Sequence, residues 1–312
     1  MEGLNATLLS QDSQERLQRI RSLLCQVPTG QKMLSWLDDH GNNIHIVDTM
    51  PGCDGMVPEK MPLGMVPFDG GEIFLNACET DVRLAIVLAH EARHVWQHNQ
   101  LAKGDGHPFG GGMLSRFVDN PWAYSIMARF IEADAASMEY MLIQELIGQT
   151  GLDHGVQRMK LGDSVVAGLV KFGLGASDTT PKAAQRKYVF DRFFQNDRCT
   201  KYDEHYVQNT VRGALFNVFR GLDRRLTPDV LRRDHALMEQ DILMLGRCAW
   251  GEQDGDNYLT DPQGGFDMNA HYTSGFSKRL KRRFNALALN PGCRGLNTYV
   301  RQNGQKQKLI SR

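Results

Sequence analysis

The chain has 312 residues, of which 41% are hydrophobic and 23% are charged. These values are typical of a folded globular protein and exclude a largely disordered chain. No stretch contains the roughly 20 consecutive apolar residues that a membrane-spanning helix needs, so we expect no membrane protein. The chain has 36 basic and 36 acidic residues, and its formal net charge of zero conceals an uneven distribution.

The positive charge is concentrated in the C-terminal tail. Residues 268–312 contain ten lysines and arginines and no acidic residue, whereas residues 1–267 contain 26 basic and 36 acidic residues. Residues 277–289 are predicted to form a basic helix with one apolar side. Such a helix either packs on the acidic remainder of the chain or binds an anionic partner such as nucleic acid, and both interpretations stay open.

The cysteines and the N-terminus bear on the cellular compartment. The six cysteines lie far apart in the sequence and form no CxxC pair, which disfavours a cysteine zinc site and a disulfide-dense scaffold. The first 20 residues lack the positive patch and apolar core of a signal peptide. We therefore expect a cytoplasmic protein with reduced thiols.

In chain order, the sequence predicts helices throughout and strands only near the N-terminus. Pro28 divides the first helical region, and Thr80 and Asp81 suit the start of the helix that follows the second strand. Pro181 and Pro228, each preceded by threonine, mark two later helix starts. The predicted helices include residues 11–38, 80–100 and 121–147, the strands are 44–47 and 72–77, and the loops are 50–71 and 103–113. The expected fold class is α+β, predominantly α-helical.

An HExxH motif on the helix predicted at 80–100 carries the clearest chemical signal. His90 and His94 are four residues apart, so they project from one face of the helix and can reach a single metal ion. Glu91 lies beside them, where it can take a proton from a metal-bound water. The residues before the motif are apolar around the whole helix, which indicates burial, and buried histidines need partners. We expect a Zn²⁺ site with His90 and His94 as ligands and Glu91 as the catalytic base.

A catalytic zinc site needs a third protein ligand, and the helix predicted at 121–147 offers two carboxylates. Glu132 is flanked by alanines that would allow a close approach of two helices, whereas Asp134 falls within an apolar stripe. Two residues correspond to about 200° of helix rotation, so both cannot point at one ion. We favour Glu132 as the ligand and Asp134 as a group that orients a histidine. Two alternatives stay open: the reverse assignment, and a solvated Glu132 with a buried, hydrogen-bonded Asp134 and no metal role for either.

The segments LAHEARHVWQ and FIEADAASM together resemble zincin metallopeptidases of the gluzincin type. More narrowly, they resemble an uncharacterised family of bacterial proteins with HExRH and EADA motifs that are expected to be metallopeptidases. The resemblance covers residues 70–147 and implies a zinc ion held by His90, His94 and Glu132, with Glu91 as the base. It also implies that a strand edge near residues 72–77 binds an extended substrate, although the same pattern allows an internal strand.

The pattern along the chain, together with this resemblance, predicts three regions. We expect an N-terminal helical segment at residues 1–39, a zincin-like metallopeptidase core with a small sheet at residues 40–150, and a helical C-terminal region with the basic tail at residues 151–312. The expected function is a zinc-dependent metallopeptidase that hydrolyses peptide or protein substrates. The alternatives are an inactive zincin-like protein-interaction module and a metal-dependent hydrolase of a non-peptide substrate.

Peptide hydrolysis also needs a donor that stabilises the oxyanion. The candidates are His107, Tyr124, Tyr140 and His154, and the sequence does not choose among them. The glycine-rich segment at residues 104–112 is either a lid or a connector. The absence of GxxxxGK[ST], GxGxxG and GxSxG motifs disfavours nucleotide-dependent enzymes and serine hydrolases.

Overall fold

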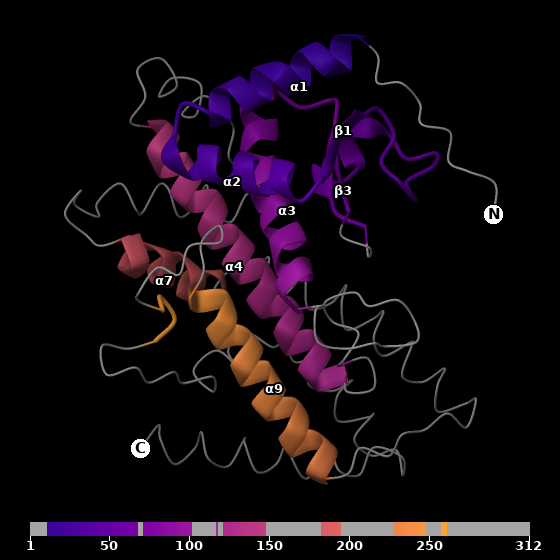
Figure 1. The fold of residues 1–312 in the computed structure, drawn as a ribbon. Coiled ribbons are helices and arrows are strands. Elements are labelled where there is room, and N and C mark those ends of the chain that lie inside the picture. Colours follow the sequence, from indigo (N-terminus) through magenta and orange to yellow (C-terminus); the bar gives the residue numbers. More distant parts are fainter. Residues whose placement is uncertain are drawn as a thin grey trace. The chain divides into compact units, whose positions relative to one another are not determined.

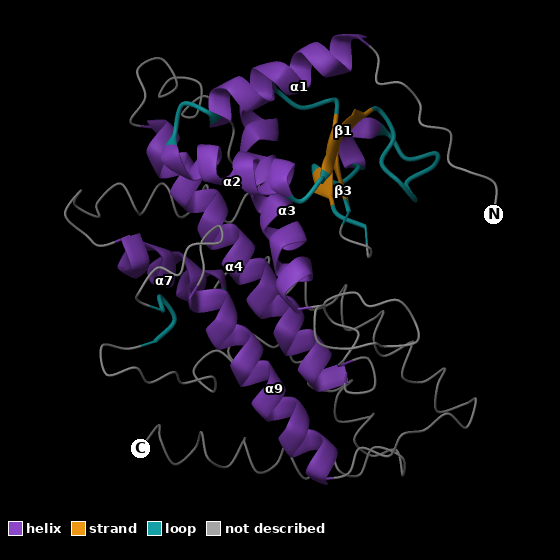
Figure 2. Ribbon diagram, in the orientation of Figure 1, coloured by secondary structure: helices purple, strands orange, loops and turns teal. Residues whose placement is uncertain are grey.

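The computed structural model describes residues 11–67, 71–101, 117, 121–147, 182–194, 228–247 and 257–260. These residues are mostly helical and include a small three-stranded sheet (Figures 1 and 2), so the predicted α+β, predominantly helical class is confirmed for them. None of the described helices combines the length and apolar character that a membrane span requires. The glycine-rich segment and the basic tail lie outside the described residues.

The described chain divides into two compact units. The first contains the described residues of 11–100 and 137–147, and the second contains those of 101–136 and 182–260. Helix α4 (Pro121–Ile147) is one continuous helix that contributes to both units. The boundaries expected from the sequence, at residues 39–40 and 150–151, stay a prediction.

The first unit begins with two helices, α1 (Gln11–Leu24) and α2 (Pro28–Asp39). Pro28 occupies the first turn of α2, which confirms the predicted division of this region. Gly30 permits the sharp join, because a Cβ atom there would clash with the carbonyl oxygen of Leu24. The α2 N-terminus is held by α4, since the Glu145 carboxylate accepts hydrogen bonds from the Thr29 amide and hydroxyl, each at 2.8 Å.

The sheet has the strand order β1-β3-β2. β1 (Asn43–Val47) pairs in parallel with β3 (Glu72–Asn76), and β2 (Gly64–Met65) pairs with β3 in the antiparallel direction. A short 3₁₀ turn, η1 (Pro58–Lys60), precedes β2. The buried side chains of β1 and β3 match in register, with Ile44 opposite Ile73 and Ile46 opposite Leu75. β3 is therefore the internal strand of the three, and β2 lies at an edge.

Helix α3 (Asp81–Leu101) follows β3 after a four-residue turn. Thr80 caps it, since its hydroxyl accepts from the amide of Arg83 at 3.4 Å. Two arginines of α1 hold the same end. Arg16 and Arg19 contact the two carboxylate oxygens of Asp81 at 3.0 and 2.7 Å, and Arg16 also donates to the carbonyl of Ala77 at 2.6 Å. The start of the motif-bearing helix is thus tied to α1.

The second unit contains part of α4 together with α7 (Lys182–Phe193) and α9 (Pro228–Arg247). Phe130 of α4 packs with Phe190 and Phe194, with ring centroids 5.5 and 5.4 Å apart. Asn257 closes the end of α9, because its side-chain amide donates to the carbonyl of Leu243 at 2.8 Å. Aromatic packing and terminal hydrogen bonds therefore hold this unit around one face of α4.

Candidate metal centre

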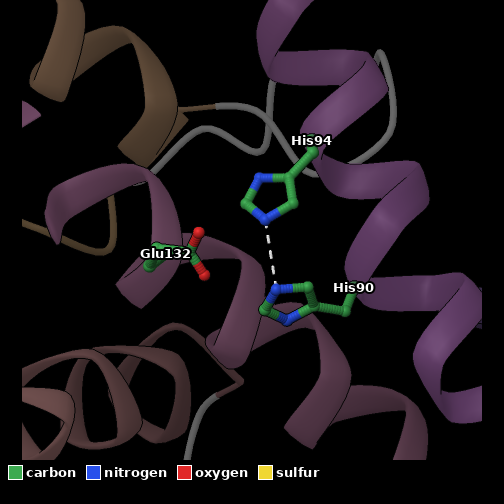
Figure 3. Close-up of side chains that lie close together, drawn as sticks. All are labelled: His90, His94 and Glu132. Carbon is green, nitrogen blue, oxygen red and sulfur yellow. Dashed lines mark hydrogen bonds between the residues drawn. The ribbon is translucent and has the colours of Figure 1, made fainter. Parts of the chain in front are cut away.

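His90 and His94 lie on the same face of α3, one helical turn apart, as the motif predicts. Their Nε2 atoms are 3.1 Å apart, and their rings are nearly perpendicular at 85° (Figure 3). Nitrogen ligands at about 2.0–2.1 Å from a tetrahedral zinc ion would be about 3.3–3.4 Å apart. The separation of the two Nε2 atoms is therefore close to what a shared zinc ion requires.

The opposite ring nitrogen of each histidine faces an oxygen atom. Nδ1 of His94 lies 2.8 Å from Oε1 of Gln97, which is fully buried. Nδ1 of His90 lies 3.4 Å from Oε2 of Glu139, an ion-pair distance without hydrogen-bond geometry. An acceptor at Nδ1 favours the tautomer with its proton there, which leaves Nε2 as the lone-pair donor. The bond to Gln97 thereby favours a His94 imidazole that offers Nε2 to a metal, whereas the contact of His90 with Glu139 is electrostatic.

Glu132 of α4 completes a group of three ligand-type side chains. One carboxylate oxygen of Glu132 and one nitrogen each of His90 and His94 lie within 4.8 Å of one another (Figure 3). Glu132 precedes Glu139 by seven residues, or about two turns, and therefore shares its helix face. Because Glu139 contacts His90, the face of α4 that carries both Glu132 and Glu139 is the face nearest to the histidines. Glu132 is buried, with 4% of its surface exposed.

The residues present fit a zinc ion. Two imidazole nitrogens and one carboxylate oxygen are a ligand set of catalytic zinc sites, which keep a further position for water. The Glu132 carboxylate would have to move closer to the histidine nitrogens by on the order of 1 Å for the three ligand atoms to have the mutual separations found around one zinc ion. A glutamate side chain can make such a movement by small torsional changes.

Glu91 is the next residue after His90 and is buried, with 9% of its surface exposed. It lies against β2, because a Cβ atom built on Gly64 would be 2.6 Å from Cγ and 2.8 Å from Oε1 of Glu91. The carboxylate is therefore confined between its own helix and the edge strand. A buried carboxylate next to two histidines that can bind a metal, as Glu91 is here, is suitably placed to act as a general base.

Asp134 makes its strongest described contacts within the second unit. Its Oδ1 atom accepts hydrogen bonds from the hydroxyl of Tyr258 at 2.7 Å and from Nη2 of Arg186 at 3.1 Å. Asp134 is fully buried, and the Arg186 guanidinium also stacks over the Tyr258 ring at 4.0 Å. Among the described residues, the group of ligand-type atoms contains Glu132 and not Asp134. The groups that face the histidine Nδ1 atoms are Gln97 and Glu139.

Arg93, inside the HExxH motif, is fully buried and places its guanidinium 3.8 Å from the centre of the Trp96 ring. Of the oxyanion candidates, Tyr140 is buried and Tyr124 is half-buried. Burial raises the pKa of Tyr124 above its ordinary value, so its phenol stays protonated and able to donate at neutral pH. His107 and His154 lie outside the described residues.

Sequence reasoning missed three residues of this site: Gln97, Glu139 and Gly64. Gln97 had a local signal, because it lies three residues after His94 on the same helix, within reach of its ring. Glu139 had a weaker one, as a carboxylate two turns after Glu132. Gly64 had none, since its contact with Glu91 depends on how the sheet lies on α3.

Comparison of the chain with protein-family models, with curated proteins and with solved structures found no match. The resemblance to zincin metallopeptidases therefore stays an expectation from the motif residues.

Proposed function

We propose that this chain is a zinc-dependent peptidase, in which His90, His94 and Glu132 hold the zinc ion and Glu91 is the general base. The observation that carries the proposal is the orientation of the two imidazoles. Their Nε2 atoms converge to 3.1 Å while each Nδ1 atom faces an oxygen of Gln97 or Glu139. A histidine pair with only a packing role has no need for both features together.

The surrounding fold supports a zincin-like arrangement. The motif helix α3 follows the central strand of a small sheet, and a later helix, α4, supplies the third carboxylate. Glu91 lies between α3 and the edge strand β2. The motif resemblance implies a strand, the motif helix and a later carboxylate for residues 70–147. The substrate-binding edge that it also implies at residues 72–77 is not present in the described sheet, because β3 is paired on both sides.

His90, His94 and Glu132 would hold the zinc ion, which would lower the pKa of a bound water to about 7 and polarise a substrate carbonyl. The chain's own residues supply the proton transfers. Glu91 accepts a proton from the attacking water as the new carbon–oxygen bond forms, and returns it to the leaving nitrogen as the carbon–nitrogen bond breaks. Tyr124 and Tyr140 are the described candidates for donation to the oxyanion.

The decisive experiment measures zinc and peptide cleavage together. Zinc is quantified by mass spectrometry of the purified chain, and cleavage is followed with a mixture of unstructured synthetic peptides. Glu91→Gln is expected to retain one zinc per chain and to lose about 10²–10⁴-fold in cleavage rate, the usual contribution of a general base. Glu72→Gln, at a half-exposed position of β3, is the matched control and is expected to keep both properties.

Each result has a clear consequence. Stoichiometric zinc with cleavage that depends on Glu91 supports the proposal. A chain that binds no zinc overturns the metal site. Zinc binding without cleavage of any peptide overturns the peptidase activity and leaves an inactive module or a hydrolase of another substrate.

A further inference from the structure

The edge strand β2 passes over α3 at the proposed general base. A Cβ atom on Gly64 would lie 2.6 Å from Cγ of Glu91, 2.6 Å from Cγ1 of Val87 and 2.8 Å from Oε1 of Glu91. Contacts below 3.0 Å at a Cβ atom essentially do not occur, so any side chain at position 64 forces a neighbour to move. Glycine is therefore required here by space, and its backbone forms one wall around the Glu91 side chain.

The strand has little freedom to move away from the helix. β2 is paired with β3 through Gly64 opposite Leu75 and Met65 opposite Phe74. The buried Asn76 at the end of β3 reinforces this pairing, because its backbone amide donates to the carbonyl of Leu63 at 3.0 Å. Its side-chain oxygen also accepts from the amide of Cys78 at 3.0 Å, in the turn that leads into α3. Strand and helix are thus fixed to one another through a short, hydrogen-bonded connection.

The two side chains that face Gly64 differ in how easily they yield. Val87 is β-branched and strongly prefers one χ1 rotamer in a helix, so it resists displacement. Glu91 has three side-chain torsions and can move its carboxylate at lower energetic cost. A methyl group at position 64 would therefore displace Glu91 at the lower energetic cost of the two, although the contact with Val87 also has to be relieved.

We infer that Gly64 is a positioning residue: the bare backbone of β2 at this position holds the Glu91 carboxylate in the place from which it acts as general base. The inference rests on the proposed function for its catalytic consequence. The steric relationship between Gly64 and Glu91 is independent of any activity. It can therefore be tested separately.

The kinetic test uses Gly64→Ala, with Gly71→Ala as the matched control. A Cβ atom on Gly71 would meet nothing within 4 Å, and this glycine lies just before β3 in the same sheet region. Gly64→Ala is expected to lower kcat about 10²-fold, as a misplacement of about 1 Å does, with KM and zinc content almost unchanged. In a Glu91→Gln background the same substitution is expected to cause no further loss. Unchanged kcat in Gly64→Ala, or an equal loss in both backgrounds, would overturn the inference.

A thermal test covers the case in which Gly64→Ala folds poorly, and it needs neither zinc nor substrate. Glu91→Ala removes both atoms of Glu91 that a methyl at position 64 would meet, and Val87→Ala removes the remaining close contact. In a Val87→Ala background, the fall in Tm caused by Gly64→Ala is therefore expected to be much smaller when Glu91→Ala is also present than when Glu91 is intact. An equal fall with and without Glu91→Ala would show that Glu91 does not occupy this space. Loss of the peptidase activity itself would leave this thermal coupling intact, so the two failures are distinguishable.

Discussion

Nδ1 of His94 lies 2.8 Å from Oε1 of Gln97, one turn further along the same helix. An amide oxygen at this position can only accept, so it selects the imidazole tautomer with the proton on Nδ1. The Nε2 lone pair then faces Nε2 of His90. Local helix geometry thus both presents the two histidines together and sets the protonation of one of them.

Replacing Gln97 is expected to weaken zinc binding. Gln97→Leu keeps the approximate volume but removes the acceptor, and loss of such a partner typically costs 10–100-fold in metal affinity. Asn99→Leu is the control on the same helix, since the Asn99 amide donates to the carbonyl of Val95 on that helix. Zinc affinity is measured by competition with a chromophoric chelator. Equal affinity of Gln97→Leu and the unmodified chain would contradict a role for Gln97 at the metal site.

Glu139 is expected to support zinc binding through its contact with His90, and its negative charge adds an electrostatic contribution. Glu139→Ala removes the oxygen 3.4 Å from Nδ1 and is expected to reduce zinc affinity about 10–100-fold. Glu139→Gln retains an acceptor without the negative charge. Its zinc affinity is therefore expected to lie between that of the unmodified chain and that of Glu139→Ala. Chelator competition on the three proteins gives the order. A larger loss in Glu139→Gln than in Glu139→Ala would exclude this explanation.

The third ligand is decided by comparing Glu132→Gln with Asp134→Asn. Glu132→Gln is expected to lose zinc while leaving the Tm of the zinc-free chain nearly unchanged, and the Tm values of both variants are compared after zinc removal. Asp134→Asn is expected to retain zinc but to lower Tm, because Asp134 is fully buried against Arg186 and Tyr258. Alanine is unsuitable at position 134, since an uncompensated buried arginine costs about 3–5 kcal/mol. Zinc lost from Asp134→Asn and kept by Glu132→Gln would reverse the assignment.

The contact of α1 with the start of α3 is expected to weaken at acid pH. Burial raises the pKa of Asp81, but hydrogen bonds from Arg19 and Arg16 outweigh it, so the pKa lies below its ordinary value of 3.8. A lowered pKa in the folded state contributes stability above pH 3.8 that is lost as the pH falls through the folded value. Asp81→Asn should therefore lower Tm at pH 7, with the difference from the unmodified chain shrinking towards pH 3.

Thermal unfolding of both proteins between pH 7 and pH 3 measures this effect. Asp54→Asn, at an exposed loop position, serves as the control and is expected to follow the unmodified chain throughout. A Tm difference for Asp81→Asn that stays constant across this range would show that the two ion pairs do not contribute.

The positions of the helices could be predicted well because their signals are local. Pro28 begins α2, Thr80 caps α3, and the motif helix is buried where its apolar residues surround it. The strand at residues 72–77 was also predictable, but whether it was internal or at an edge was not. That property depends on β1 and β2, which pair with it from distant parts of the sequence.

By itself, the sequence determined that His90 and His94 share a helix face with Glu91 beside them, because the helical period fixes the relation of residues four apart. Only the tertiary structure decided which groups meet that face. Gly64 lies against Glu91 because the sheet packs on α3, and Glu139 faces His90 because α4 presents that side. Asp134, two residues from Glu132, is directed instead to Arg186 and Tyr258. The physical reason is that contacts between elements depend on the rotation and packing of each element, which no local spacing encodes.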